Sequence, residues 1–244
     1  MTATLAEATT ALHSQWDRLR AWILEVVVEA DDTAVAAAPS ILEGWTVTAL
    51  VAHVGRAMDA LAACTPLPAD TTPLTLAEYL GTYAGRAADI AETTRAIAAQ
   101  VAPDPVGWID ARAAAAFATL AAADGRDLVV QARRGPVRLS TMTVSRVIEL
   151  VVHADDLAVS VRRVPGADAG PDPVDPGALD LVARELLAIV VARGGWDLEV
   201  VDPLTWIRLA TGRAPCGTSS LAAALAPRWT SDGLPDLGRM LPIL

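Results

Sequence analysis

Two histidines and a glutamate are the residues of this chain whose types and spacing best suit metal chemistry. Glu149 and His153 are four residues apart, so both lie on one stripe of any helix that spans them. His53 lies on the apolar face of a separate helical stretch. Two imidazoles and one carboxylate are the ligand set of zinc sites that keep a fourth position open. These three residues are therefore a candidate set of metal ligands. Asp156, one turn beyond His153, could orient that histidine through its ring N–H.

Each of these residues also has a purely structural interpretation. A Glu and a His four residues apart are common by chance, and their stripe could simply face water. A lone histidine such as His53 on an apolar face is more often a core residue with one hydrogen bond, and Asp156 could be a surface residue. The metal site is favoured because the chain has three histidines, two of which lie on inward stripes of different helices. The third, His13, is expected at the surface or between helices.

The stretch over residues 141–163 is the element around which the chain is organised. It contains no Gly or Pro, and it is apolar on nearly every side, which is typical of a buried helix. Thr141 or Thr143 is the expected N-cap. An unpaired charge inside such a helix is costly, so Glu149 needs a partner, and a metal ion would serve.

Helical periodicity predicts further helical stretches over residues 4–30, 44–61, 75–100 and 108–123. Thr46 would cap the second of these, on which Arg56 is expected opposite to the face of His53. Asp31 would begin the exit from the first stretch, and Gly81 and Gly85 could split the third.

The chain is predicted to be mainly α, with a helical bundle over residues 1–163 and a small α+β unit over 178–244. A linker rich in Pro, Gly and Asp joins them over 164–177. A β-leaning stretch over 127–139, turned at Arg134, predicts a small hairpin. Helices of the small unit are expected at 178–193, within 198–213 and at 218–227.

Composition excludes several classes of protein. The net charge of −10 weighs against a nucleic-acid partner. All nineteen basic residues are Arg, which excludes Schiff-base lysine chemistry and a P-loop. Cys64 and Cys216 are expected to be free, buried thiols. No apolar run is long enough for a membrane span, and the N-terminus lacks signal-peptide features, so the expected location is cytoplasmic.

Two motifs, GWTVTALVAHV and RVIELVVHADDLA, together resemble the N-terminal domain of mycothiol-dependent maleylpyruvate isomerases and their DinB-like relatives. In that family a Gly-Trp entry precedes the first metal histidine, and an E-x3-H-x2-D segment supplies the other ligands. The family positions fall on Gly44, Trp45, His53, Glu149, His153 and Asp156. From about residue 178, the segments VDPLTWIRLATGR and LPIL resemble the sterol-carrier-like C-terminal domain often attached to this family.

The resemblance implies an enzyme that depends on Zn²⁺ or another divalent metal and on mycothiol. Coordination would deprotonate this low-molecular-weight thiol, which would add to an electrophilic small molecule. The adduct would either rearrange, as in an isomerase, or stay attached, as in an S-transferase. Asp156 and Arg213 are the expected catalytic residues. Arg208 and Arg213 are expected to bind the cofactor or a substrate carboxylate, because the Arg fork suits two oxygens. The protein would be a monomer or homodimer without nucleic-acid or membrane partners.

Two other functions are open at this point. The bundle could hold a metal ion only to stabilise its fold, in which case four protein groups would usually close the site. Alternatively, the small unit could carry a lipid or another small molecule, which would need an apolar cavity within residues 178–244.

Overall fold

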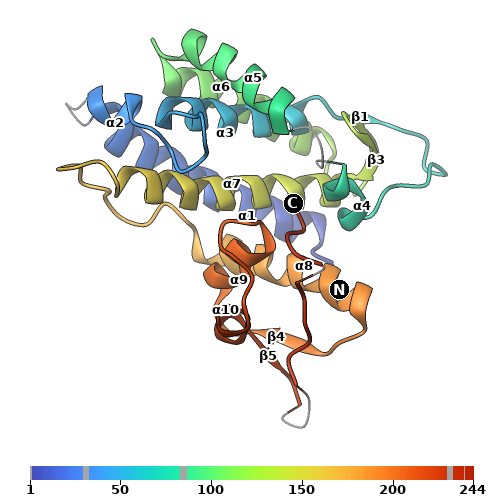
Figure 1. The fold of residues 1–244 in the computed structure, drawn as a ribbon. Helices are drawn as coiled ribbons and strands as arrows, with labels where there is room; N and C mark the ends of the chain where they lie inside the picture. The colour runs from blue at the N-terminus through green and yellow to red at the C-terminus, as the bar shows by residue number, and fades with distance from the viewer. Residues whose placement is uncertain (1, 30–32, 83–86, 230–232, 239) are drawn as a thin grey trace.

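A helical bundle makes up most of the computed structural model, which describes residues 2–29, 33–82, 87–229, 233–238 and 240–244. Its main helices are α1 (Leu5–Trp22), α3 (Val47–Ala62), α6 (Pro105–Ala122) and α7 (Leu139–Val161) (Figure 1). Helix α7 packs against both α1 and α3, and α6 covers α3. The predicted mainly helical fold is confirmed. The helix exit at Asp31 and the break at Gly85 lie outside the described residues.

Shorter elements complete the bundle. They are the π-helix η1 (Ile23–Glu29), α2 (Thr33–Ala37), α4 (Leu76–Gly81) and α5 (Ala87–Val101). Helix α5 packs against α3, so the helix that carries His53 has neighbours on three sides.

Helix α7 is buried along almost its whole length, as its apolar composition predicts, and its polar stripe does not face water. The predicted N-cap was wrong. The helix begins at Leu139, and no side chain of the residue before it caps the helix. Instead Asp127 accepts hydrogen bonds from the backbone N–H of Ser140 at 2.8 Å and from its hydroxyl at 2.9 Å. A carboxylate distant in sequence thus satisfies the first turn of α7.

The position of helix α3, which carries His53, is fixed by its N-terminal cap and by one close contact. Thr46 caps the helix as predicted, accepting a hydrogen bond from the backbone N–H of Ala49 at 3.1 Å. Gly55 allows close approach to α6, since a Cβ atom there would lie 2.2 Å from a ring carbon of Trp108. Any larger residue would force α3 and α6 apart.

The predicted hairpin is confirmed and extends into a small antiparallel sheet. Strands β2 (Val129–Ala132) and β3 (Gly135–Arg138) pair with each other, and β1 (Thr65–Pro66) adds to β2. Ala132 pairs with Gly135, so the two-residue turn between the strands consists of Arg133 and Arg134. Because β3 leads directly into α7, this turn is held beside the bundle.

The C-terminal part is a small α+β unit, as predicted. It comprises α8 (Pro176–Gly194), β4 (Leu198–Val200), α9 (Pro203–Ala210), α10 (Thr218–Ala224) and β5 (Leu225–Pro227). Strands β4 and β5 pair antiparallel. The helix predicted over 218–227 therefore ends at Ala224, because the next three residues form a strand edge with β4.

The C-terminal unit lies along one side of the bundle, and α8 packs against α1 and α7 (Figure 1). The segment before α8 also packs on the bundle. Gln15 of α1 donates to the carbonyl of Pro173 at 3.0 Å and accepts from the backbone N–H of Asp175 at 2.9 Å. Buried apolar residues from Leu5 to Ile243 form one continuous cluster. The division into domains at 164–177 stays a prediction. Among the described residues, no helix has both the length and the apolarity needed to cross a membrane.

Candidate metal centre

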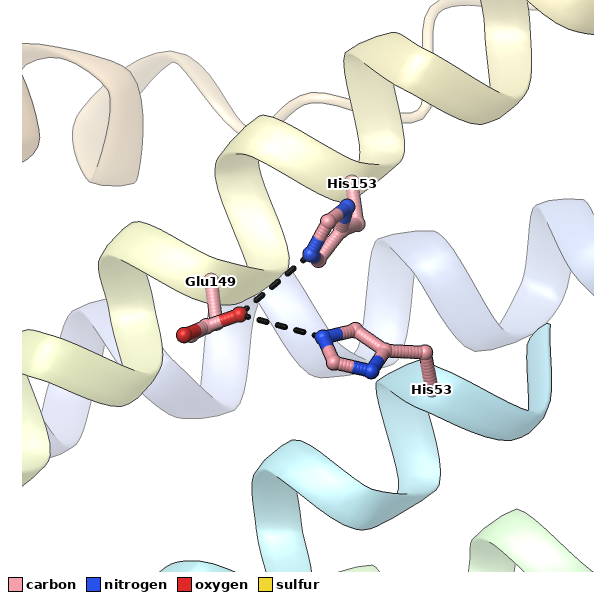
Figure 2. Close-up of side chains that lie close together, drawn as sticks. All are labelled: His53, Glu149 and His153. Atoms are coloured by element: carbon pink, nitrogen blue, oxygen red, sulfur yellow. Dashed lines mark ion pairs between the residues drawn. The ribbon is translucent and has the colours of Figure 1, made fainter. Parts of the chain in front are cut away.

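His53 on α3 and Glu149 and His153 on α7 converge on one point between the two helices (Figure 2). The Oε2 atom of Glu149 lies 3.4 Å from Nε2 of His53 and 3.3 Å from Nε2 of His153. One potential ligand atom of each residue lies within 4.8 Å of the others. Residues almost a hundred positions apart in sequence are thus brought together by the packing of α3 on α7.

The electrostatics of this cluster keep Glu149 ionised. Burial lowers the pKa of His53, and the hydrogen bond with Glu149 offsets this only in part. Burial also acts on His153, but contacts with Asp156 and Glu149 outweigh it and raise its pKa. Burial would raise the pKa of Glu149, yet the two imidazoles and Arg146 hold it well below its usual range. Glu149 is therefore an ionised, largely buried carboxylate.

The two histidines are directed toward the cluster by contacts on their other ring nitrogens. Nδ1 of His153 lies 2.9 Å from Oδ2 of Asp156, which is fully buried. Nδ1 of His53 lies 3.5 Å from the hydroxyl of Thr94, and the edge of the His53 ring contacts Trp45 at 5.1 Å between centroids. Both Nε2 atoms thus face Glu149, so two nitrogens and one oxygen fit the donor set of a divalent ion.

A cavity of about 440 Å³ opens beside the cluster. All three cluster residues line it, and five arginines contribute to its surface, in a chain whose net charge is −10. These arginines are Arg56, Arg133, Arg134, Arg146 and Arg213. The apolar part of the lining comes mainly from Leu42, Trp45, Tyr79, Ile148, Val152 and Leu244. The cavity therefore combines apolar walls with a concentration of positive charge.

Arg213 and Arg208 of the C-terminal unit occupy different places. Arg213 lines the cavity and donates to Oδ2 of Asp156 at 3.0 Å. Arg208 does not line it and instead forms a two-pronged salt bridge with Asp155, at 2.6 and 2.7 Å. Its predicted binding of a cofactor or substrate has no support in this arrangement, because Nε and Nη2 of its guanidinium both bind the carboxylate of Asp155.

Arg56 corrects another prediction. It was expected on the face of α3 opposite to His53, but it lines the same cavity, because residues three apart on a helix share a face. Arg146 and the arginines of the β2–β3 turn also line the cavity and were not predicted to do so. Arg146 precedes Glu149 by three residues, a spacing that was visible in the sequence. Arg133 and Arg134 were recognised only as part of a turn, since nothing local shows what that turn faces.

The remaining histidine and the cysteines lie outside the cluster. His13 is exposed and stacks on Phe117 of α6 at 3.8 Å between ring centroids, in agreement with the predicted place between helices. Both cysteines are free, but only Cys64 is buried; the prediction for Cys216 was wrong, because it lies in an exposed connection before α10.

Only Cys216 is expected to react with iodoacetamide in the native protein. Burial raises the pKa of the Cys64 thiol to about 11, so at about pH 8 roughly one Cys64 in a thousand is the reactive thiolate. Peptide mass mapping after alkylation measures this. In guanidinium chloride both cysteines should react. Rapid native labelling of Cys64 would contradict its assignment as a buried, unreactive thiol.

The fold and the site together define a class of protein. It is a helical bundle whose interior carries a cluster of two histidines and one carboxylate. A family model described as "Mycothiol maleylpyruvate isomerase N-terminal domain" matches residues 12–158. This match spans more than half of the chain, and the chain belongs to that family. It ends before the C-terminal unit, whose sterol-carrier-like character stays a prediction.

Comparison with solved structures gives a consistent fold. A crystal structure described as that of "the mycothiol-dependent maleylpyruvate isomerase" is similar, with a TM-score of 0.50, 22% sequence identity, and coverage of 78% of this chain and 72% of that one. At this identity the likeness concerns the fold alone. No curated protein sequence matches the chain.

Proposed function

We propose that this protein is a metal-dependent enzyme that activates a low-molecular-weight thiol, mycothiol, for addition to an electrophilic small molecule. The observation that carries the proposal is the convergence of His53, Glu149 and His153 at the edge of a 440 Å³ cavity. Membership of a family described by mycothiol and maleylpyruvate isomerase supports the choice of thiol. Three protein donors leave a position for an outside ligand, as in catalytic zinc sites.

His53, Glu149 and His153 would hold the ion, with Zn²⁺ the best match to two imidazoles and one carboxylate. The ion, when bound, supplies the charge that lowers the pKa of a coordinated thiol. Asp156 keeps the Nδ1 proton of His153 in place, because its buried carboxylate accepts from that nitrogen. Ligand orientation is thereby maintained by a buried residue one turn beyond His153 that does not itself line the cavity.

The arginines of the cavity would bind an anionic part of the substrate. Arg133 and Arg134 stand on the β2–β3 turn, and Arg213 comes from the C-terminal unit. A guanidinium matches the two oxygens of a carboxylate. Arg213 already donates to Asp156, so its role would combine support of His153 with contact to the substrate. The apolar walls, Ile148 and Val152 among them, would exclude water from the reacting sulfur.

The proposal is tested by adding mycothiol to the Co²⁺-loaded protein. The visible absorbance of Co²⁺ is expected to change on addition of mycothiol and to stay unchanged with its S-methyl derivative, which cannot be deprotonated at sulfur. A panel of electrophiles then separates the two reaction types: an isomerase returns free mycothiol, and an S-transferase consumes it.

An unchanged spectrum and unreacted electrophiles would contradict the proposal and favour a metal ion that only stabilises the bundle. The carrier alternative has less support. Of the described residues in 178–244, Arg213 and Leu244 alone line the cavity described above. A second cavity, of about 230 Å³, takes only Glu185 from them.

A further inference from the structure

The two histidines of the cluster have unequal partners on their outer ring nitrogens. For His153 the partner is the carboxylate of Asp156, at 2.9 Å from Nδ1. For His53 it is the hydroxyl of Thr94, at 3.5 Å from Nδ1. A carboxylate can only accept a hydrogen bond, whereas a hydroxyl can donate or accept. The hydroxyl oxygen of Thr94 can therefore accept a hydrogen bond from a proton on Nδ1 of His53.

Thr94 is built into this position. It is fully buried, although its neighbours Thr93 and Arg95 on α5 are exposed. Arg56, three residues beyond His53 on α3, donates from Nη1 to the Thr94 hydroxyl oxygen at 2.7 Å. That charged hydrogen bond fixes the oxygen between the two helices. A second lone pair of the same oxygen stays available to His53.

Trp45, another neighbour of the His53 ring, cannot perform this task. Trp45 meets the ring edge-on, with an interplanar angle of 69°. This contact limits where the ring lies but does not distinguish one ring nitrogen from the other. A polar partner is needed to keep the proton on Nδ1 so that the lone pair of Nε2 is available to an ion.

We propose that Thr94, held in place by Arg56, is a positioning residue for His53 that keeps Nε2 directed at the metal cluster. The inference rests on the proposed metal site but not on the identity of the thiol. Thr94 acts through His53 and does not itself line the cavity.

The test compares Co²⁺ affinity in matched variants. Thr94→Val, which removes the hydroxyl and keeps the shape, is expected to raise the dissociation constant for Co²⁺ about tenfold, the usual effect of losing an outer partner of a metal ligand. Thr94→Ser should restore binding. Thr143→Val is the control, because Thr143 is equally buried and its hydroxyl bonds only to the carbonyl of Leu139 on its own helix.

A spectroscopic signature separates positioning from a general loss of stability. In the Co²⁺ protein, the exchangeable ring N–H proton of His53 should give a shifted NMR signal that is lost to solvent exchange in Thr94→Val, while that of His153 persists. If Thr94→Val binds Co²⁺ as tightly as the control, or if Thr94→Ser binds as weakly as Thr94→Val, the inference is overturned. Should Thr94→Val not fold, Thr94→Ala against Thr94→Ser gives the same comparison. A wild-type protein that binds Co²⁺ but ignores mycothiol would overturn the proposed function and leave this comparison valid.

Discussion

His53→Ala is expected to weaken metal binding by more than about 100-fold, since it removes one of three ligands and even outer partners of a ligand contribute 10–100-fold. The bundle should remain folded. The buried residues of α3 are apolar or Gly and stay in place, and Glu149 keeps His153 and Arg146 as partners. Elemental analysis after loading with Zn²⁺ and dialysis measures the loss, and circular dichroism monitors the helices.

His13→Ala is the control for this experiment. It changes the same residue type, but His13 is exposed on α1 and contacts Phe117 instead of the cluster, so metal content should be unchanged. A chelator should lower the melting temperature of the wild type and of His13→Ala but not of His53→Ala, because a ligand that binds only the folded state stabilises it. Undiminished zinc in His53→Ala would count decisively against the assignment of His53 as a ligand.

The helices and the pairing of Glu149 with His153 could be predicted because both follow from local periodicity. The unbroken apolar run of α7 requires burial, and the spacing of Glu149 and His153 fixes their common face whatever surrounds the helix. Thr46 caps α3 because capping is also local. The joining of His53 to the other two residues went beyond periodicity and depended on the paired motifs.

Contacts between distant segments could not be predicted. Asp127 satisfies the start of α7 across the hairpin, so the threonines near that start are not needed as caps. Arg208 looked suited to a substrate but pairs with Asp155, and only the docking of α9 against α7 decides this. Thr94 was missed because α5 carries no pattern that marks one polar residue as inward-facing.

The effect of Asp156→Asn on the cluster should exceed that of any other substitution outside the three ligands. Asp156 is fully buried and joins His153 to Arg213, at 2.9 and 3.0 Å. An amide in its place can turn its N–H₂ group toward the N–H of His153, where an acceptor is needed. It also leaves the positive charge of Arg213 without the negative charge that it pairs with. Metal affinity is expected to fall about 10–100-fold, and the free energy of unfolding of the metal-free protein by about 3 kcal/mol.

The neighbouring residue provides the decisive control. Asp155→Asn makes the same chemical change one position away and breaks the salt bridge between α7 and Arg208 of α9. In the part of the chain that the structure describes, Asp155 forms no hydrogen bond or ion pair with His53, Glu149 or His153. If Asp156 acts by orienting His153, Co²⁺ titration should show weakened binding in Asp156→Asn and near-normal binding in Asp155→Asn, while urea unfolding shows a loss in both. Equal losses of Co²⁺ affinity would mean that the carboxylates act only by docking the C-terminal unit.

Arg213→Ala then separates the two roles of that arginine. If Arg213 only binds substrate, metal affinity stays at the wild-type value, and if it supports Asp156, affinity falls in the same direction as in Asp156→Asn.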